Sequence, residues 1–108
     1  MLEAGVRVLI YAGDVDFICN WIGNKAWTQA LRWSGHEAFN AEQDRPWVYT
    51  NDKHRAVEGG KARTATSKSG KGKLTFLQVY EAGHMVPMDQ PQAALALLNT
   101  FLQDKDFY

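Results

Sequence analysis

The chain has 108 residues, of which 45% are hydrophobic, and its 12 basic residues balance its 12 acidic residues. A chain of this length buries only about 60 to 70% of its unfolded surface, which is enough for one small core. The balanced charge gives no reason to expect nucleic acid as a partner, and no apolar run approaches the roughly 20 residues that span a membrane. The single cysteine excludes an internal disulfide.

The first expected element is a strand at residues 6–12, whose nearly continuous apolar sequence is typical of parallel strands covered on both faces. The strand ends at Gly13, and Asp14 and Asp16 follow directly. Carboxylates just past the carboxyl end of a strand serve either as turn residues or as an active-site acid. With two acids in the turn, the sequence has room for one of each.

A helix is predicted next, from a cap at Asn20 to about Trp33. The apolar residues that share one face of it are Ile22, Ala26, Trp27, Ala30 and Leu31. Tryptophans at helical spacing favour packing in a core or an interface over a sugar-binding platform. Residues 34–45 are irregular and polar, so we expect a loop with at most one turn of helix and with His36 on the surface.

A bulged hairpin is the simplest interpretation of the middle of the chain. Residues 47–50 predict one strand, and the residues from Arg55 onward predict a second strand that Gly59 and Gly60 interrupt. Residues 64–73 have the composition of a flexible, solvated loop, and they lack the full glycine and lysine spacing of a phosphate-binding loop. No metal-ligand spacing and no boundary between domains is visible, so one domain is expected over residues 1–108.

The most informative stretch is residues 80–91, which places His84 where a predicted strand at residues 74–80 ends. Gly83 tolerates the positive φ that a turn there would need, and Pro87 disfavours helix at Met85 and Val86. A closing amphipathic helix is predicted to start near Pro91 and to run to about residue 103. By itself, His84 is equally compatible with a structural and with a catalytic histidine.

The predicted order of strand, helix, β-hairpin, strand and helix indicates an α/β fold. In α/β-hydrolases the catalytic residues follow the chain order serine, acid, histidine, each on a loop at the carboxyl end of a strand. Asp16 and His84 fit the second and third places. These residues contain no Gly-x-Ser-x-Gly sequence, so a serine nucleophile would precede residue 1.

Two segments, residues 13–27 and residues 74–91, resemble the acid loop and the histidine signature of serine carboxypeptidases. The resemblance implies an α/β-hydrolase fold and the release of single amino acids from the carboxyl ends of peptides, without a cofactor. It also implies that Asp16 is the triad acid, that His84 is the general base, and that Cys19 and Met85 line the substrate side. A lysosomal, vacuolar or secreted location is implied in the same way.

The resemblance covers only a carboxyl-terminal part of that family, without the serine, the oxyanion hole or the groups that bind the peptide carboxylate. We therefore expect a fragment of one catalytic domain that is inactive without the amino-terminal remainder of the enzyme. A fragment of this kind exposes a sheet edge and helix faces, which favours a homo-oligomer or strand exchange.

Two other classes stay open at this point. A different α/β-hydrolase, such as an esterase, would share the same arrangement of strands and loops. A non-catalytic interaction module would agree with the absent nucleophile. Cys19 as a nucleophile is disfavoured, because it lies only three residues from Asp16 and would share its turn.

Overall fold

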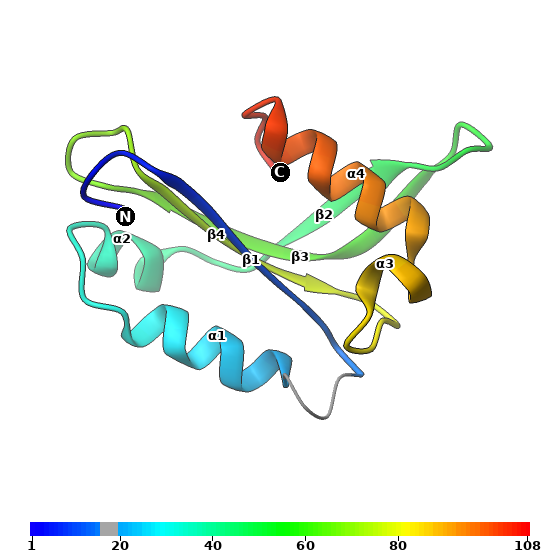
Figure 1. Ribbon diagram of the computed structural model, residues 1–108, viewed down its shortest axis with the longest axis horizontal. Helices are drawn as coiled ribbons and strands as arrows, with labels where there is room; N and C mark the ends of the chain where they lie inside the picture. Colours follow the sequence, from blue (N-terminus) through cyan, green and yellow to red (C-terminus); the bar gives the residue numbers. More distant parts are fainter. Residues whose placement is uncertain (16–19) are drawn as a thin grey trace.

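The structure is a computed structural model that describes residues 1–15 and 20–108, and it has helices on both faces of one sheet (Figure 1). The strands are β1 (Arg7–Gly13), β2 (Arg45–Thr50), β3 (Ala56–Thr66) and β4 (Lys73–Val79). The helices are α1 (Trp21–Ala30), α2 (His36–Ala41), α3 (Val86–Asp89) and α4 (Pro91–Leu102). The predicted α/β class is therefore confirmed.

The sheet has the order β1-β4-β3-β2. β1 and β4 are parallel, with Arg7 opposite Lys73 and Gly13 opposite Val79, and the other two strand pairs are antiparallel. Because β1 and β4 are parallel neighbours, the loops that leave their carboxyl ends start side by side. The sequence predicts the catalytic groups in these two loops.

Alternating side chains of the strands form two cores, one on each face of the sheet. Leu77 and Val79 of β4 pack with Ala93 and Leu97 of α4. On the opposite face, buried Leu74 and Phe76 pack with Phe39 of α2 and with the partly buried Val8 and Ile10 of β1. The expectation that residues 6–12 form a parallel strand covered on both faces is therefore confirmed in part, because several side chains of β1 stay half-exposed.

The bulged hairpin is confirmed. Trp47 lies opposite Gly60 and Val48 lies opposite Glu58, so Gly59 is the additional residue of β3. The expected flexible loop at residues 64–73 is shorter than predicted, because residues 64–66 belong to β3 and Lys73 begins β4. Ser67 in the remaining loop is buried, and its hydroxyl accepts a hydrogen bond of 3.0 Å from the amide of Gly72.

Helix α1 starts as predicted, since the side chain of Asn20 accepts hydrogen bonds from the amides of Ile22 and Gly23. The helix ends at Ala30 rather than at Trp33, and its predicted apolar face is not buried in this chain. Ile22 is 60% exposed and Trp27 is 45% exposed. Periodicity identifies an apolar face, but it does not reveal whether the partner of that face lies within the same chain.

His36 is not the surface residue that the sequence suggested. It begins α2, is half-buried, and its Nδ1 atom lies 2.8 Å from the carbonyl oxygen of Leu31. This contact joins the start of α2 to the residue that follows α1. A histidine in an irregular polar segment gives no sequence signal of such a contact.

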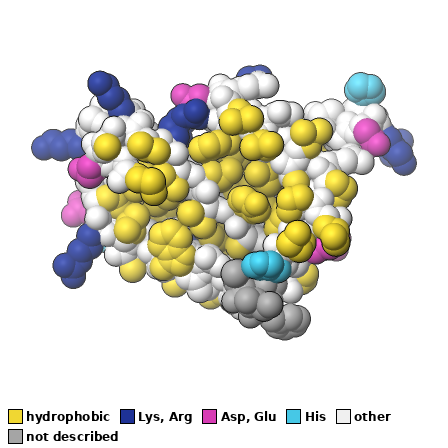
Figure 2. All heavy atoms as spheres, in the orientation of Figure 1, with side chains coloured by type: hydrophobic (Ala, Val, Ile, Leu, Met, Phe, Trp, Pro, Cys, Tyr) yellow, Lys and Arg dark blue, Asp and Glu magenta, His cyan; other side chains and the backbone are white. Residues whose placement is uncertain are grey.

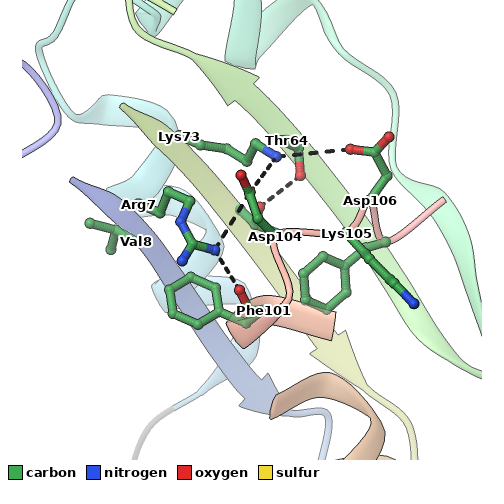
Figure 3. Close-up of a pocket in the computed structure, with 10 residues that line it drawn as sticks. Arg7, Val8, Thr64, Lys73, Phe101, Asp104, Lys105 and Asp106 are labelled. Carbon is green, nitrogen blue, oxygen red and sulfur yellow. Dashed lines mark hydrogen bonds and ion pairs between the residues drawn. The ribbon is translucent and has the colours of Figure 1, made fainter. Parts of the chain in front are cut away.

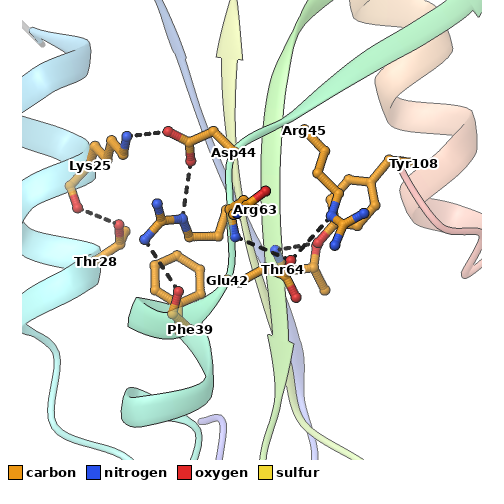
Figure 4. A network of polar contacts seen from close by, with 10 residues as sticks. Lys25, Thr28, Phe39, Glu42, Asp44, Arg45, Arg63, Thr64 and Tyr108 are labelled. Carbon is orange, nitrogen blue, oxygen red and sulfur yellow. Dashed lines mark hydrogen bonds and ion pairs between the residues drawn. The ribbon is translucent and has the colours of Figure 1, made fainter.

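A partly buried ion-pair network fastens α1 to the sheet (Figure 4). Asp44 forms ion pairs with Lys25 of α1 and, at 3.0 Å, with Arg63 of β3. Partial burial by itself would raise the pKa of Asp44, but its hydrogen bonds and ion pairs with Lys25 and Arg63 outweigh burial and lower the pKa below its usual value. The helix that follows residues 16–19 is therefore held to the sheet by charge as well as by packing.

The carboxyl-terminal end of α4 is fastened to the amino-terminal ends of β1 and β4 (Figure 3). The guanidinium of Arg7 donates to the carbonyl oxygen of Phe101 and lies 5.0 Å from the centre of the Phe101 ring. Asp104 pairs with both Arg7 and Lys73, which stand at the amino-terminal ends of β1 and β4. These contacts fix the carboxyl-terminal end of α4.

Candidate functional site

The loops at the carboxyl ends of β1 and β4 are joined by hydrogen bonds. The amide of Asp14 donates to the carbonyl of Val79 at 3.0 Å, and the amide of Val15 donates to the carbonyl of Ala82 at 3.0 Å. The amide of Glu81 donates to the Oδ1 atom of Asp14 at 2.8 Å. We call this contact between residues 13–15 and residues 79–83 the strand-end junction.

Two backbone features make this close approach feasible. A Cβ atom on Gly13 would lie 2.1 Å from the carbonyl oxygen of Ala82, so only glycine fits at the end of β1. In the turn after β4, Glu81 has the positive φ, at 54°, rather than Gly83 as predicted. A left-handed conformation at a residue other than glycine is uncommon, and it persists only where neighbouring bonds hold it.

His84 lies directly after the strand-end junction, and it is exposed. The amide of the preceding residue, Gly83, donates to the Oδ2 atom of Asp89 in α3 at 2.7 Å. Met85 precedes α3 and is 56% exposed, so its side chain is accessible next to the histidine. The backbone is therefore held before His84 by the bond to Asp89 and after it by the start of α3.

The prediction about Pro87 is wrong by one residue. Helix was expected to be excluded from Met85 and Val86, but α3 begins at Val86 and has Pro87 in its first turn. A proline is tolerated there because the first amides of a helix have no partner within the helix. The predicted start of the closing helix is confirmed, since α4 begins at Pro91.

Asp16 and Cys19 lie outside the described residues, so their predicted roles as acid and as substrate-side residue stay predictions. The last residue described before them is Val15, which is bonded to Ala82, two residues before His84. The first residue described after them is Asn20, the cap of α1. The structure thus brings the start of the acid loop to the histidine loop.

Two features of the site could not be predicted from the sequence. They are the hydrogen bond from Gly83 to Asp89 and the shifted pKa of the Tyr80 phenol. Burial, and then the nearby carboxylate of Glu58, raise the pKa of the Tyr80 phenol.

In the described part of the chain no group of three or more histidine, cysteine, aspartate or glutamate side chains is arranged to hold a metal ion. No described helix is long and apolar enough to cross a membrane.

Fold and site together define an α/β protein in which hydrogen bonds join the two loops that follow the parallel strands β1 and β4. A family model described as serine carboxypeptidase matches residues 1–104. The chain is 52% identical to a carboxypeptidase Y homolog A of Sclerotinia sclerotiorum over 99 residues, which are 92% of this chain and 16% of that protein.

The chain is also 46% identical to serine carboxypeptidase 3 of Oryza sativa subsp. japonica over 105 residues, which are 97% of this chain and 19% of that protein. The chain therefore belongs to the serine carboxypeptidase family, as the sequence resemblance predicted. It spans between 16 and 19% of the length of these two relatives.

Proposed function

We propose that this chain is the carboxyl-terminal part of the catalytic domain of a serine carboxypeptidase with an α/β-hydrolase fold. In this proposal Asp16 is the triad acid and His84 is the general base, while the serine belongs to the amino-terminal remainder of the enzyme. Cys19 and Met85 line the substrate side. The substrates are peptides, which lose single amino acids from their carboxyl ends, in a lysosome, in a vacuole or outside the cell.

The observation that carries this proposal is the strand-end junction. In triad chemistry a carboxylate bonds one imidazole nitrogen and stabilises the cation, while the other nitrogen takes the proton of the serine. The acid and the histidine must therefore stand on neighbouring loops with little freedom. The bonds of Asp14 and Val15 to residues 79–82 provide such neighbouring, fixed loops.

A second observation supports a larger parent protein. β1 is the first strand in the sheet order, and hydrophobic side chains gather across the face of the molecule shown in Figure 2. Two apolar hollows of about 320 and 330 Å³ flank β1, one toward α1 and one toward α4. The residues of these hollows that we call the β1 edge surface are Val8, Ile10, Tyr11, Trp27, Leu95 and Leu98.

Apolar surface of this kind costs free energy in water and is usually covered. We infer that the amino-terminal remainder of the enzyme covers the β1 edge surface. In its absence the same surface would favour association of two copies of the chain.

The proposal is tested with a chimera in which this whole chain replaces the matching segment of the Sclerotinia sclerotiorum relative. We expect the chimera to release amino acids from blocked dipeptides at mildly acidic pH, and the chain alone to release none. His84→Asn should lower kcat by about 10⁴- to 10⁶-fold, because the serine loses its base. His54→Asn, at an exposed histidine in the turn between β2 and β3, is the matched control and should leave kcat unchanged.

Three results would contradict the proposal. An inactive but folded chimera would favour a non-catalytic role for this chain. A chimera that cleaves esters but no peptides would favour the esterase alternative. Activity that survives His84→Asn would remove His84 from the mechanism.

A further inference from the structure

We infer that Asp14 and Asp89 are positioning residues that hold the backbone carrying His84 in place from two sides. The inference rests on the proposed function and goes beyond it, because it assigns these carboxylates a role distinct from that of Asp16. Neither residue needs to touch the substrate or the imidazole for this role. Each of them acts through the main chain just before the histidine.

Three consecutive residues before His84 bond to neighbouring elements through their main chain, and the carbonyl of Glu81 also accepts from the side-chain amide of Gln90 at 3.3 Å. The amide of Glu81 donates to Asp14 at 2.8 Å, and the amide of Gly83 donates to Asp89 at 2.7 Å. Between them, the carbonyl of Ala82 accepts from the amide of Val15 at 3.0 Å. The segment is therefore held by a carboxylate at the end of β1 and by another carboxylate in α3.

The distances support strong contacts. Hydrogen bonds from an amide to an ionised carboxylate are shorter and stronger than bonds between neutral groups, and both distances lie in that short range. Asp14 is half-buried and Asp89 is exposed, so water competes less for the carboxylate of Asp14. We therefore expect Asp14 to contribute more than Asp89.

The bond from Glu81 to Asp14 lies where the backbone needs support. Glu81 has a φ of 54°, a conformation that is unfavourable for any residue with a Cβ atom. Loss of the Asp14 carboxylate would let Glu81 relax toward negative φ. That rotation would move residues 82–84, and with them His84, relative to the end of β1.

The test uses alanine and asparagine variants of Asp14 and Asp89 in the chimera described above. Asp14→Ala should lower kcat by about 10- to 100-fold with little change in KM, because displacement of a catalytic group by about 1 Å has effects of this size. Asp14→Asn keeps an oxygen that accepts from the Glu81 amide, so it should restore kcat to within a few fold. Asp89→Ala should also lower kcat, but by a smaller factor. Asp52→Ala is the matched control and should leave kcat unchanged, because Asp52 is exposed in the β2–β3 turn.

Rates are expressed per folded chimera, with the folded amount measured by gel filtration. A loss with Asp14→Ala that Asp14→Asn rescues supports the inference. It is overturned if Asp14→Ala keeps the wild-type kcat, if Asp14→Asn loses as much as alanine does, or if the whole loss reflects fewer folded molecules. An inactive wild-type chimera would overturn the proposed function and this inference with it, whereas an active one that tolerates Asp14→Ala would overturn this inference alone.

Discussion

The carboxyl end of β1 and the outer edge of the same strand differ in how many of their contacts come from this chain. At the strand-end junction, Asp14 and Val15 bond to residues 79–82, and Gly13 has room for no side chain at all. Along the β1 edge surface, Tyr11, Trp27 and Leu98 remain between 44 and 49% exposed. The chain thus joins the loops after β1 and β4 by its own contacts, while part of its apolar surface stays exposed.

The difference indicates that substitutions in the two regions should have different effects. A bond that joins two loops fixes their relative position to within a fraction of an ångström, and such precision is what catalysis needs. An apolar surface needs only a cover of suitable shape. Substitutions at the junction should therefore change the relative position of the two loops, and substitutions at the β1 edge surface should change the association of the chain.

The largest effect is expected for Gly13→Ala. The new Cβ atom would lie 2.1 Å from the carbonyl oxygen of Ala82, so the two loops would have to separate. We expect the free energy of unfolding to fall by about 3 kcal/mol, as for a steric clash in a packed region, and urea denaturation of the chain measures it.

Gly23→Ala is the matched control for this substitution. Nothing lies within 4 Å of a Cβ atom at Gly23, which stands inside α1. Alanine there should raise the free energy of unfolding by about 0.5 to 1 kcal/mol, because alanine favours helix over glycine. Equal losses at Gly13 and Gly23 would contradict the account of the junction.

A smaller effect is expected for Asp44→Ala, which breaks the network that fastens α1. The side chain of Arg63 is only 10% exposed and would keep an unpaired charge, whereas Asp44 is 29% exposed. Removal of one partner of a fully buried pair costs about 3 to 5 kcal/mol, and we expect about 2 kcal/mol here because water reaches Asp44. Thermal or urea unfolding at neutral pH provides the measurement.

The same network predicts a dependence of stability on pH. The folded state lowers the pKa of Asp44, so the unfolded state binds more protons near that pKa and the stability falls as the pH falls. The contribution is fully present above the unfolded pKa of about 3.9 and is lost as the pH falls through the lower, folded value. Asp44→Asn should remove this part of the acid dependence, and an unchanged acid profile would show that other carboxylates cause it.

The smallest effect on stability is expected at the β1 edge surface. Leu98→Lys changes a side chain that is 49% exposed, so the free energy of unfolding should change by less than about 0.5 kcal/mol. Self-association of the chain should weaken, which sedimentation velocity detects. Leu97→Ala, one residue earlier and 5% exposed, should instead cost about 2 to 3 kcal/mol without weakening association.

Much of the fold follows from local signals in the sequence. β-branched and apolar runs predict β1 and β4, Asn20 predicts the start of α1, and Pro91 predicts the start of α4. These signals are local because caps, turns and strand runs depend on a few neighbouring residues. His84 was predicted at the end of a strand for the same reason, and its place in the structure agrees.

The remainder depends on contacts between residues far apart in the chain. The exposure of Ile22 and Trp27 on the apolar face of α1 could not be predicted, because periodicity does not show which element covers a face. The bonds from Glu81 to Asp14 and from Gly83 to Asp89 depend on the pairing of β1 with β4 and on the position of α3. The sequence favours a positive φ at Gly83, because glycine adopts it without strain. The structure has it at Glu81, whose amide bonds Asp14.

The central claim is that the loops after β1 and β4 act as one catalytic unit. The most direct test compares Asp16→Asn, His84→Asn and the double variant in the chimera, with kcat for a blocked dipeptide as the measurement. Groups that act as a unit are not additive, so the double variant should be no slower than His84→Asn alone, within a few fold. If the two losses multiply instead, Asp16 and His84 act independently and the account is contradicted.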